Sequence, residues 1–288
     1  MKVGIFKISS KSDSLTEYEN AVIEYLDKYN HEIFIDIKLF KNLSFKKHTQ
    51  LLDITKIDVL FTIGGDGTLL RAIPLVKDSN VPVLGINTGQ LGFLTSVNKE
   101  SLIKGLDMFF NKKYILIKRT IIELKTLPEI FEITSFPYAL NEIAINSKNS
   151  TSMLSIKTII NQKLLTTYWS DGLIISTPTG STGYSLSSGG PIISPDANVF
   201  VLNPIAPHNI SIRPLIVPDV SEIEIHVTGR SIKHLISLDN RRVPIKNGSS
   251  ISISKASFCI KTIQLDGDDF FMTLRDKLFW GLDKRNRQ

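Results

Sequence analysis

The sequence predicts an α/β domain built on a parallel sheet, followed by an all-β domain, with a last helix that returns to the first domain. In the first third of the 288 residues, strand-like and helix-like segments alternate, which is typical of a parallel sheet with helices on its faces. From about Arg119 the apolar runs become short and β-rich, and turn clusters separate them, which indicates a sandwich or layered domain. We therefore expect an α/β domain of residues 1–118 plus 267–288 and a β-rich domain of residues 119–266.

The first domain contains short apolar or alternating runs that predict strands. These runs are residues 3–8, 33–37, 58–63 and 81–86. Between them, apolar residues recur at helical spacing, which predicts helices over residues 16–30, 68–76 and 99–111. We expect a break or kink near Pro74, because proline lacks the N–H that a helix interior requires.

The second domain is predicted from short runs rich in β-branched and aromatic residues. They cover residues 120–124, 138–145, 154–160, 173–176, 222–227 and 250–253, with turn clusters at 147–152, 161–162 and 247–249. The last segment, residues 270–284, has helical spacing at Phe271, Leu274, Leu278 and Leu282. We expect this helix to pack on the first domain, which makes that domain discontinuous.

The composition excludes several classes of protein. Hydrophobic residues make up 42% and charged residues 22%, which excludes a disordered tail, a collagen-like repeat and a disulfide scaffold. Lys and Arg number 34 against 28 Asp and Glu, a net charge of +6, but no basic block is long enough to predict a nucleic-acid or membrane partner. No apolar run reaches the roughly 18 residues of a membrane span, and the first strand carries Lys7 and no cleavage site. We expect a cytoplasmic protein in which the single Cys259 is a buried thiol.

A glycine-rich loop follows the third predicted strand and opens a helix. Its residues are Gly64, Gly65, Asp66, Gly67 and Thr68. Glycines permit close backbone approach, and the N-terminus of the following helix offers free N–H groups to an anion. A carboxylate in such a loop can take the proton of an alcohol during phosphoryl transfer. The alternative is an ordinary strand-to-helix turn in which Asp66 is the N-cap.

A second glycine-rich loop, residues 87–93, follows the fourth predicted strand. Because the carboxyl ends of neighbouring parallel strands line one crevice, two such loops favour a nucleotide site. Phe93 could stack on a base or fix the loop in the core. The Walker A pattern is absent, as is the Gly-x-Gly-x-x-Gly pattern after the first strand, which excludes the common triphosphatase and dehydrogenase interpretations.

A third segment, residues 176–191, is dense in serine, threonine and glycine. Their hydroxyls and backbone amides suit ribose and phosphate oxygens, and the ring of Tyr184 suits an adenine face. The alternative is a long flexible loop. Asn141 and Glu142 are an amide–carboxylate pair that could hold two ribose hydroxyls, but polar pairs of this kind are also ordinary at strand ends.

Together these segments resemble the NAD kinase family over nearly the whole chain. The matching motifs are residues 64–71, 85–94, 141–142, 171–172, 177–184 and 273–285. Gly-Gly-Asp-Gly is shared with phosphofructokinases and with diacylglycerol and sphingosine kinases. The Thr-Pro-Thr-Gly-Ser-Thr-Gly-Tyr segment at 177–184 is far more specific. One departure is Gly183, where many members of the family have alanine.

The resemblance implies an NAD kinase-like two-domain fold, with a phosphate-loop domain and an NAD-binding domain. It implies transfer of the γ-phosphoryl of ATP, or of polyphosphate, to the 2′-hydroxyl of the adenosine ribose of NAD, giving NADP. It also implies a homodimer or homotetramer and a divalent ion, Mg²⁺ or Mn²⁺, bound with the nucleotide. No His, Cys or carboxylate cluster in the sequence predicts a metal site made by the protein itself. The sequence leaves open NAD against NADH and the choice of phosphoryl donor.

The resemblance also implies roles for single residues. Asp66 would be the general base on the acceptor hydroxyl, Arg71 the basic residue of the following helix, and Asp171 a contact at the nicotinamide side. Asn141 and Glu142 would hold ribose hydroxyls. The other expected binding residues come from the glycine-rich loops, from the segment rich in Ser and Thr, and from position 206. Those from 182 to 187 would line the adenosine pocket, and Ala206 would lie near it. They are Gly64, Gly65, Gly67, Thr68, Asn87, Phe93, Thr182, Gly183, Tyr184, Ser185, Leu186, Ser187 and Ala206.

Two other functions fit part of the sequence. A lipid kinase of the diacylglycerol type shares the Gly-Gly-Asp-Gly loop, but it needs a hydrophobic acceptor groove, and the segment rich in Ser and Thr argues against one. A non-catalytic dinucleotide-sensing module would bind NAD without turnover, and the retained Asp66 argues against it.

Overall fold

The structure is a computed structural model that describes residues 1–8, 17–36, 49–89, 92–147 and 153–281. The chain divides into two compact units, residues 1–118 with 260–288 and residues 119–259. The chain passes from the second unit back to the first between residues 259 and 260, inside the continuous strand Ser250–Leu265. The sequence-based boundary, at residue 267, lies just after that strand. Several predicted positions lie outside the described residues: residue 16 of a helix, residue 37 of a strand, residues 90–91 of the second glycine-rich loop, residues 148–152 of a turn and residues 282–284 of the last helix.

The first unit is built on a parallel sheet. Its strands are β1 (Lys2–Phe6), β2 (Glu32–Ile35), β3 (Thr49–Leu51), β4 (Val59–Ile63) and β5 (Val83–Ile86). Their order is β5-β4-β1-β2-β3, all neighbours are parallel, and Thr262 of β17 (Ser250–Leu265) pairs in parallel with Val83. The predicted parallel sheet is confirmed.

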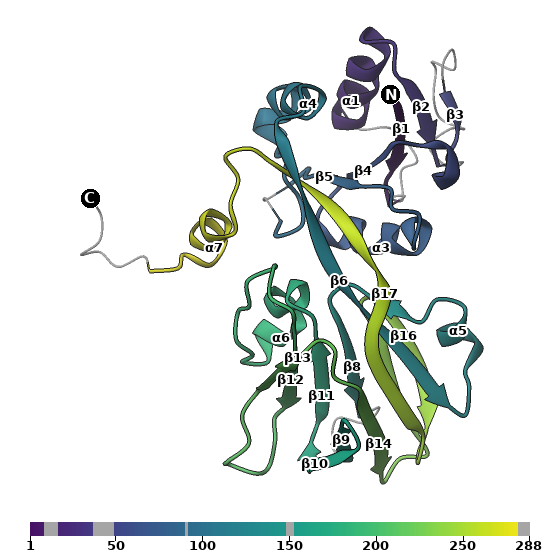
Figure 1. Ribbon diagram of the computed structural model, residues 1–288, viewed down its shortest axis with the longest axis vertical. Coiled ribbons are helices and arrows are strands. Elements are labelled where there is room, and N and C mark those ends of the chain that lie inside the picture. The colour runs from purple at the N-terminus through teal and green to yellow at the C-terminus, as the bar shows by residue number, and fades with distance from the viewer. Residues whose placement is uncertain (9–16, 37–48, 90–91, 148–152, 282–288) are drawn as a thin grey trace. The chain divides into compact units, whose positions relative to one another are not determined.

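Helices cover both faces of this sheet (Figure 1). α1 (Glu17–Lys28) and α4 (Leu102–Phe110) share a core cluster with one face of the strands, whereas α3 (Asp66–Val76) lies on the other face. Two 3-10 turns, η1 (Ile54–Lys56) and η2 (Lys99–Ser101), complete the described connections. Successive side chains of a strand point to opposite faces of the sheet, so the buried strands present an apolar face to the helices on each side.

Two predicted helix features differ in detail. Pro74 lies inside the last turn of α3 without a break before it, and the helix ends two residues later because Lys77 adopts a φ of 45°. The last helix, α7 (Phe270–Leu278), belongs to the first unit as predicted. It ends at Leu278 because Phe279 adopts the left-handed conformation, with a φ of 51°.

The strands β4 and β5 end at the same edge of the sheet. Ile63 pairs with Ile86, and the two glycine-rich loops begin at the next residues, Gly64 and Asn87. The amide of Gly64 donates to the carbonyl of Ile86 at 2.8 Å. Parallel pairing in this register therefore places the starts of both loops side by side.

The second unit consists of two antiparallel sheets around one core. One has the order β10-β9-β14-β17, with β6 beside β17 and β7 beside β6, and the other has the order β13-β12-β11-β8-β15-β16. Buried side chains of both sheets, such as Ile143 and Ile225, belong to one hydrophobic cluster. The predicted all-β domain is confirmed. Its strands are β6 (Tyr114–Leu127), β7 (Tyr138–Ala139), β8 (Glu142–Asn146), β9 (Leu154–Ile160), β10 (Lys163–Ser170), β11 (Gly172–Ser176), β12 (Val199–Ile205), β13 (Leu215–Pro218), β14 (Ile223–Gly229), β15 (Lys233–Leu238), β16 (Arg241–Lys246) and β17, with short helices α5 (Phe131–Thr134), η3 (Thr179–Thr182) and α6 (Tyr184–Ser187).

The run predicted as a single strand over residues 138–145 is two strands. β7 ends at Ala139 and β8 begins at Glu142. Between them, the amides of Leu140 and Asn141 donate to the carboxylate of Asp239 rather than to a neighbouring strand. The break leaves Asn141 and Glu142 at the start of β8.

Two expectations from composition can be compared with the described residues. No helix in the described ranges is long and apolar enough to cross a membrane. Cys259 is half-buried rather than buried, because it precedes the buried Ile260 on β17 and successive strand residues face opposite sides.

The core of the second unit gives a stability prediction. Phe200 on β12 is 0% exposed within the hydrophobic cluster, so Phe200→Ala is expected to lower the free energy of unfolding by about 3–5 kcal/mol. Urea denaturation followed by circular dichroism measures the change. The control is Phe131→Ala in the same unit, since Phe131 is 81% exposed and its loss should change stability little. Equal effects of the two substitutions would contradict the packing described.

Candidate active site

The first glycine-rich loop turns the chain sharply from β4 into α3. Gly64 has a φ of 145°, a conformation that side chains disfavour, and a Cβ there would lie 2.2 Å from Oγ1 of Thr68. Gly65 is the N-cap of α3 and supplies no side-chain acceptor. Cβ atoms placed at Gly65 or Gly67 would meet nothing within 4 Å. The first-turn N–H groups of α3 thus stand in an open, glycine-lined setting, which is suited to an anion.

Asp66 links the two glycine-rich loops of the first unit. Its Oδ2 accepts from the amide of Phe93 at 2.8 Å, and its Oδ1 accepts from the amide of Leu94 at 3.1 Å. The alternative in which Asp66 is the N-cap is wrong, because Gly65 holds that position and the carboxylate points to the second loop. A Cβ on Gly92 would lie 1.7 Å from Oδ1 of Asp66, so this contact requires glycine at 92.

The side chain of Asn87 holds the second glycine-rich loop through hydrogen bonds. It is 2% exposed, its Nδ2 donates to Oγ1 of Thr95 at 3.2 Å, and its Oδ1 accepts from the amide of Gly89 at 2.7 Å. The same threonine oxygen accepts from the amide of Gly92 at 2.8 Å. The side chain of Asn87, predicted as a binding residue, therefore supports the loop that holds Asp66.

The other predicted residues of the first unit have different surroundings. Thr68 is buried, and Arg71 is exposed in the second turn of α3. The ring of Phe93 is half-buried, with Nζ of Lys277 5.3 Å and the ring of Phe270 6.4 Å from its centroid. These contacts with α7 correspond to the alternative in which Phe93 fixes the loop.

In the second unit, Asn141 and Glu142 each present a buried side-chain oxygen. Oδ1 of Asn141 and Oε2 of Glu142 are buried and have no hydrogen-bond partner within the described part of the chain. A Cβ on Gly183 would lie 3.1 Å from Oε2 of Glu142 and 3.3 Å from Nδ2 of Asn141, so glycine at 183 keeps space beside both groups. Buried acceptors in this condition are unfavourable unless a ligand or water donates to them.

The carboxyl group of Glu142 lies in surroundings that disfavour its charge. The side chain is 7% exposed, burial and the negative charge of Asp239 raise its pKa to about 8, and the amide of Tyr184 partly opposes the rise. Asp239 accepts from the amides of Leu140, Asn141 and Glu142, and burial raises its pKa as well. Two carboxyl groups are thus held close together at the start of β8.

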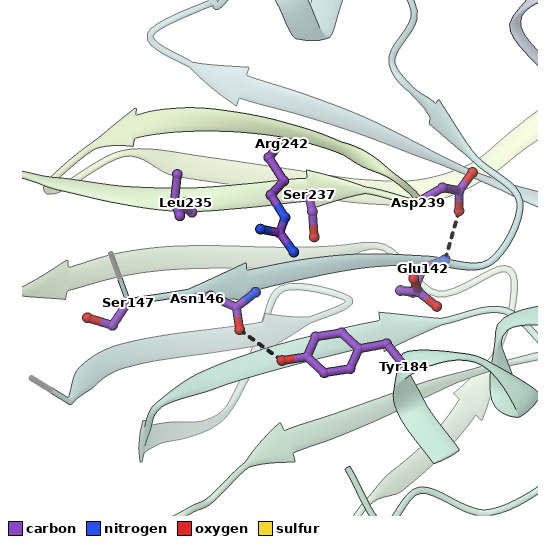
Figure 2. A pocket seen from close by; sticks show the side chains of 8 residues that line it. All are labelled: Glu142, Asn146, Ser147, Tyr184, Leu235, Ser237, Asp239 and Arg242. Atoms are coloured by element: carbon purple, nitrogen blue, oxygen red, sulfur yellow. Dashed lines mark hydrogen bonds between the residues drawn. The ribbon is translucent and has the colours of Figure 1, made fainter. Parts of the chain in front are cut away.

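A pocket of about 520 Å³ opens beside Glu142 (Figure 2). Asn146 and Tyr184 close one side, where the tyrosine hydroxyl donates to Oδ1 of Asn146 at 3.4 Å. Residues that the sequence did not indicate come from β15, β16 and the turn between them; they are Leu235, Ser237, Asp239 and Arg242. The remaining lining residue is Ser147. The only sequence signal for this wall is the Asp239-Asn240 dipeptide, which is typical of a turn.

Asp171 and Ala206 lie together near the other end of β8. The amide of Asp171 donates to the carbonyl of Ile205 at 3.0 Å, and the carbonyl of Asp171 accepts from the amide of Ser147 at 3.1 Å. Gly172 pairs with Asn146, whereas Glu142 pairs with Ser176. At a strand rise of roughly 3.3 Å per residue, the two ends of β8 are about 13 Å apart. The predicted contacts of the second unit therefore lie along one strand.

The segment rich in Ser and Thr uses many of its hydroxyls internally. Ser181 donates to the carbonyl of Pro178, and Thr182 donates to the carbonyl of Thr179. The side-chain amide of Asn203 binds the carbonyl and hydroxyl of the buried Ser185. Of the predicted adenosine-pocket residues, Tyr184 and Ser187 are exposed, and Leu186 is half-buried. The alternative of a long flexible loop is wrong, because η3 and α6 order the segment.

Comparison with known families follows the same division of the chain. A model of the ATP-NAD kinase N-terminal domain matches residues 10–114, and a model of the ATP-NAD kinase C-terminal domain matches residues 140–265. The chain belongs to the NAD kinase family. The NAD kinases of Flavobacterium psychrophilum and Christiangramia forsetii are 43% and 42% identical to it, each over 99% of this chain and 100% of the relative. The NAD kinase of Porphyromonas gingivalis is 38% identical over 97% of this chain and 98% of the relative.

Solved structures agree with this membership at the level of the fold. The crystal structure of yeast NADH kinase complexed with NADH has a TM-score of 0.87 and 24% identity, and covers 100% of this chain and 89% of that one. An NAD kinase from Archaeoglobus fulgidus in complex with ATP has a TM-score of 0.75 and 23% identity, and covers 97% of this chain and 99% of that one. The predicted NAD kinase-like fold is confirmed.

The contact between Gly92 and Asp66 gives a test of the first unit. Gly92→Ala puts a methyl group on the Asp66 carboxylate. If Asp66 has the expected role of general base, a displacement near 1 Å at this reacting group costs about a hundredfold in rate. We expect NAD kinase turnover to fall by that order, measured as NADP formation. The control is Gly89→Ala in the same loop, where the new Cβ lies 3.7 Å from Oδ1 of Asn87. Unchanged turnover in Gly92→Ala would show that the position of this carboxylate is unimportant.

Glu142 gives a pH-dependent prediction for stability. Its pKa is about 8 in the folded protein against a usual value of 4.5, so the folded state keeps a proton that the unfolded chain releases above pH 4.5. The resulting stability is complete below pH 4.5 and is lost as the pH rises to about 8, by up to about 1.4 kcal/mol per pH unit. Glu142→Gln is expected to flatten this decline in urea denaturation across that range. The exposed Glu132→Gln is the control, and a decline that is equally steep in Glu142→Gln would contradict the prediction.

Proposed function

We propose that this chain transfers the γ-phosphoryl group of ATP to the 2′-hydroxyl of the adenosine ribose of NAD, giving NADP. The observation that carries the proposal is the pair of buried, unpartnered oxygens on Asn141 and Glu142. A ribose has two neighbouring hydroxyls, which supply one donor for each of these two acceptors on adjacent residues. The family membership of the chain and its relatives' names support the same substrate.

The second unit would bind the dinucleotide along the β8 pocket. Asn141 and Glu142 would hold the ribose hydroxyls, and Tyr184, with the other residues from Thr182 to Ser187, would line the adenosine side. Asp171, near the other end of β8, would contact the nicotinamide side, and Ala206 would lie near the adenosine pocket. Arg242 places a guanidinium among the pocket residues, which suits a phosphate oxygen of the dinucleotide.

Asp66 would act as the general base. As the 2′-oxygen forms its bond to the γ-phosphorus, the proton of the hydroxyl passes to the Asp66 carboxylate. The bond between the γ-phosphorus and the bridging oxygen breaks, and its electron pair leaves with ADP. Two backbone amides orient the carboxylate, and each oxygen keeps a lone pair for the incoming proton.

The first turn of α3 and the glycines before it would receive phosphate oxygens, with Arg71 as a nearby positive charge. The described residues contain no group of three or more His, Cys, Asp or Glu side chains that could hold a metal ion. We therefore assign Mg²⁺ or Mn²⁺ to the triphosphate and its waters, where it would neutralise charge on the transferred group.

The remaining expectations concern donor, assembly and location. Polyphosphate is the alternative donor, to be compared directly with ATP. We expect a homodimer or homotetramer, measured by light scattering, and a cytoplasmic location, where NAD and ATP are both present. No nucleic-acid or membrane partner is part of the proposal.

Asp66→Asn tests the assigned base. A carboxamide cannot take the proton, so kcat for NADP formation is expected to fall by roughly 10² to 10⁴ with ATP and Mg²⁺. The NH₂ group of asparagine would face one of the two loop amides that now donate to Asp66, and one hydrogen bond would be lost. The urea midpoint of unfolding is therefore measured as well, to separate a loss of stability from a loss of catalysis. Asp78→Asn, an exposed change in the same unit, is the control. Near-normal turnover in Asp66→Asn would remove Asp66 from the reaction.

Activity and binding measurements on the wild-type protein separate the alternative functions. A wild-type protein that phosphorylates diacylglycerol in micelles but not NAD would be a lipid kinase. One that binds NAD in calorimetry and forms no NADP with ATP or polyphosphate would be a sensing module. Formation of NADP excludes the sensing module and supports the proposal.

A further inference from the structure

Asp239 closes the turn between β15 and β16 and lies beside the start of β8 (Figure 2). Its Oδ1 accepts from the amides of Asn141 and Glu142 at 2.7 and 3.2 Å, and its Oδ2 accepts from the amide of Leu140 at 2.9 Å. The amide of Asp239 in turn donates to the carbonyl of Glu142 at 3.0 Å. One side chain thus binds three consecutive amides at the start of β8.

The backbone carbonyls of Leu140 and Asn141 are held by Thr177, which lies in another segment of the chain. The amide of Thr177 donates to the carbonyl of Asn141 at 2.9 Å, and Oγ1 of Thr177 donates to the carbonyl of Leu140 at 2.6 Å. The backbone before β8 is therefore held through both its donors and its acceptors. In contrast, Oδ1 of Asn141 and Oε2 of Glu142 have no partner within the described residues.

Position 239 favours an acidic or amide side chain. Its φ of 52° lies in the left-handed region, which Asp and Asn tolerate better than other residues with side chains. A carboxylate accepts hydrogen bonds through both oxygens, whereas a carboxamide presents one acceptor and one donor group. Aspartate therefore suits both the turn conformation and the three amides.

We propose that Asp239 is a positioning residue for the ribose of the dinucleotide: it holds the Leu140–Glu142 backbone so that the side-chain oxygens of Asn141 and Glu142 stay available to the hydroxyls. This inference rests on the proposed function, because the ribose is the ligand that the two oxygens would accept from. Asp239 would touch the backbone alone and act through its two neighbours.

The groups near the Glu142 carboxyl come from several parts of the second unit. Glu142 itself is on β8, the amide of Tyr184 on α6 faces its carboxyl group, and Arg242 on β16 lines the same pocket. Arg241 donates to the carbonyls of Phe136 and Tyr138. The negative charge of Asp239 disfavours ionisation of Glu142, so its removal should lower the pKa of Glu142.

Asp239→Asn is the test variant, because asparagine keeps the left-handed turn while removing the charge and one acceptor. The expected result is a rise of about tenfold in KM for NAD, the scale of one hydrogen bond to a charged group, with KM for ATP unchanged. The pH midpoint of kcat/KM for NAD should move to lower pH, since Glu142 ionises more easily. A residue that only stabilises the fold would not move this midpoint. Asn240→Ala, an exposed change at the next residue, is the control.

Calorimetric NAD binding to the full chain separates failure of this inference from failure of the proposed function. Weaker binding in Asp239→Asn supports the inference, even if the wild type binds NAD without forming NADP, which overturns the proposed function alone. Wild-type affinity and an unmoved pH midpoint in Asp239→Asn overturn the inference, whatever the turnover. A wild type that does not bind NAD overturns both. Asp239→Ala should weaken binding further, and if it does not fold, Asp239→Asn decides the question.

Discussion

The parallel register of β4 and β5 is the constraint on which the chemistry of the first unit depends. With Ile63 opposite Ile86, the chain leaves both strands at one edge, so Asp66 can reach the amides of the second loop. A shift of one residue in this register would turn the buried side chains of β5 to the opposite face and carry the second loop away from Asp66. The glycine at 92 follows from the same geometry, since the carboxylate occupies the volume of a side chain there.

Within a few residues, the second unit combines a hydrogen-bonded backbone with buried side-chain oxygens. The backbone before β8 is fully hydrogen-bonded to Asp239 and Thr177, whereas Oδ1 of Asn141 and Oε2 of Glu142 are buried and find no partner among the described residues. Leaving such groups without donors disfavours the folded state. The rigidity supplied by Asp239 allows the unpaired oxygens to persist in fixed positions, which is the condition for binding a rigid pair of hydroxyls with little loss of entropy.

The sequence predicts the parallel sheet, the all-β domain and the glycine-rich loops because each follows from local periodicity or composition. It does not predict what depends on distant pairing. Asp66 is visible as a loop carboxylate, but its contact with residues 93–94 depends on the register of two strands. The sequence does not mark Asp239 and Arg242 as site residues, because turn dipeptides and basic strand residues are common. Only the antiparallel pairing of β8, β15 and β16 brings them to the pocket. The resemblance to NAD kinases supplies residue roles that periodicity alone does not.

The raised pKa of Glu142 has a consequence for how the dinucleotide would be taken up. With a pKa of about 8, most of the carboxyl groups carry a proton at neutral pH in the free protein. A ribose hydroxyl that donates to Oε2 favours the ionised form, so the ligand and the proton compete for the same oxygen. Binding would then release a fraction of a proton, and the apparent heat of binding would vary with the ionisation enthalpy of the buffer. The buried carboxyl group of Glu142 would thus couple occupancy of this pocket to the acidity of the surrounding solution.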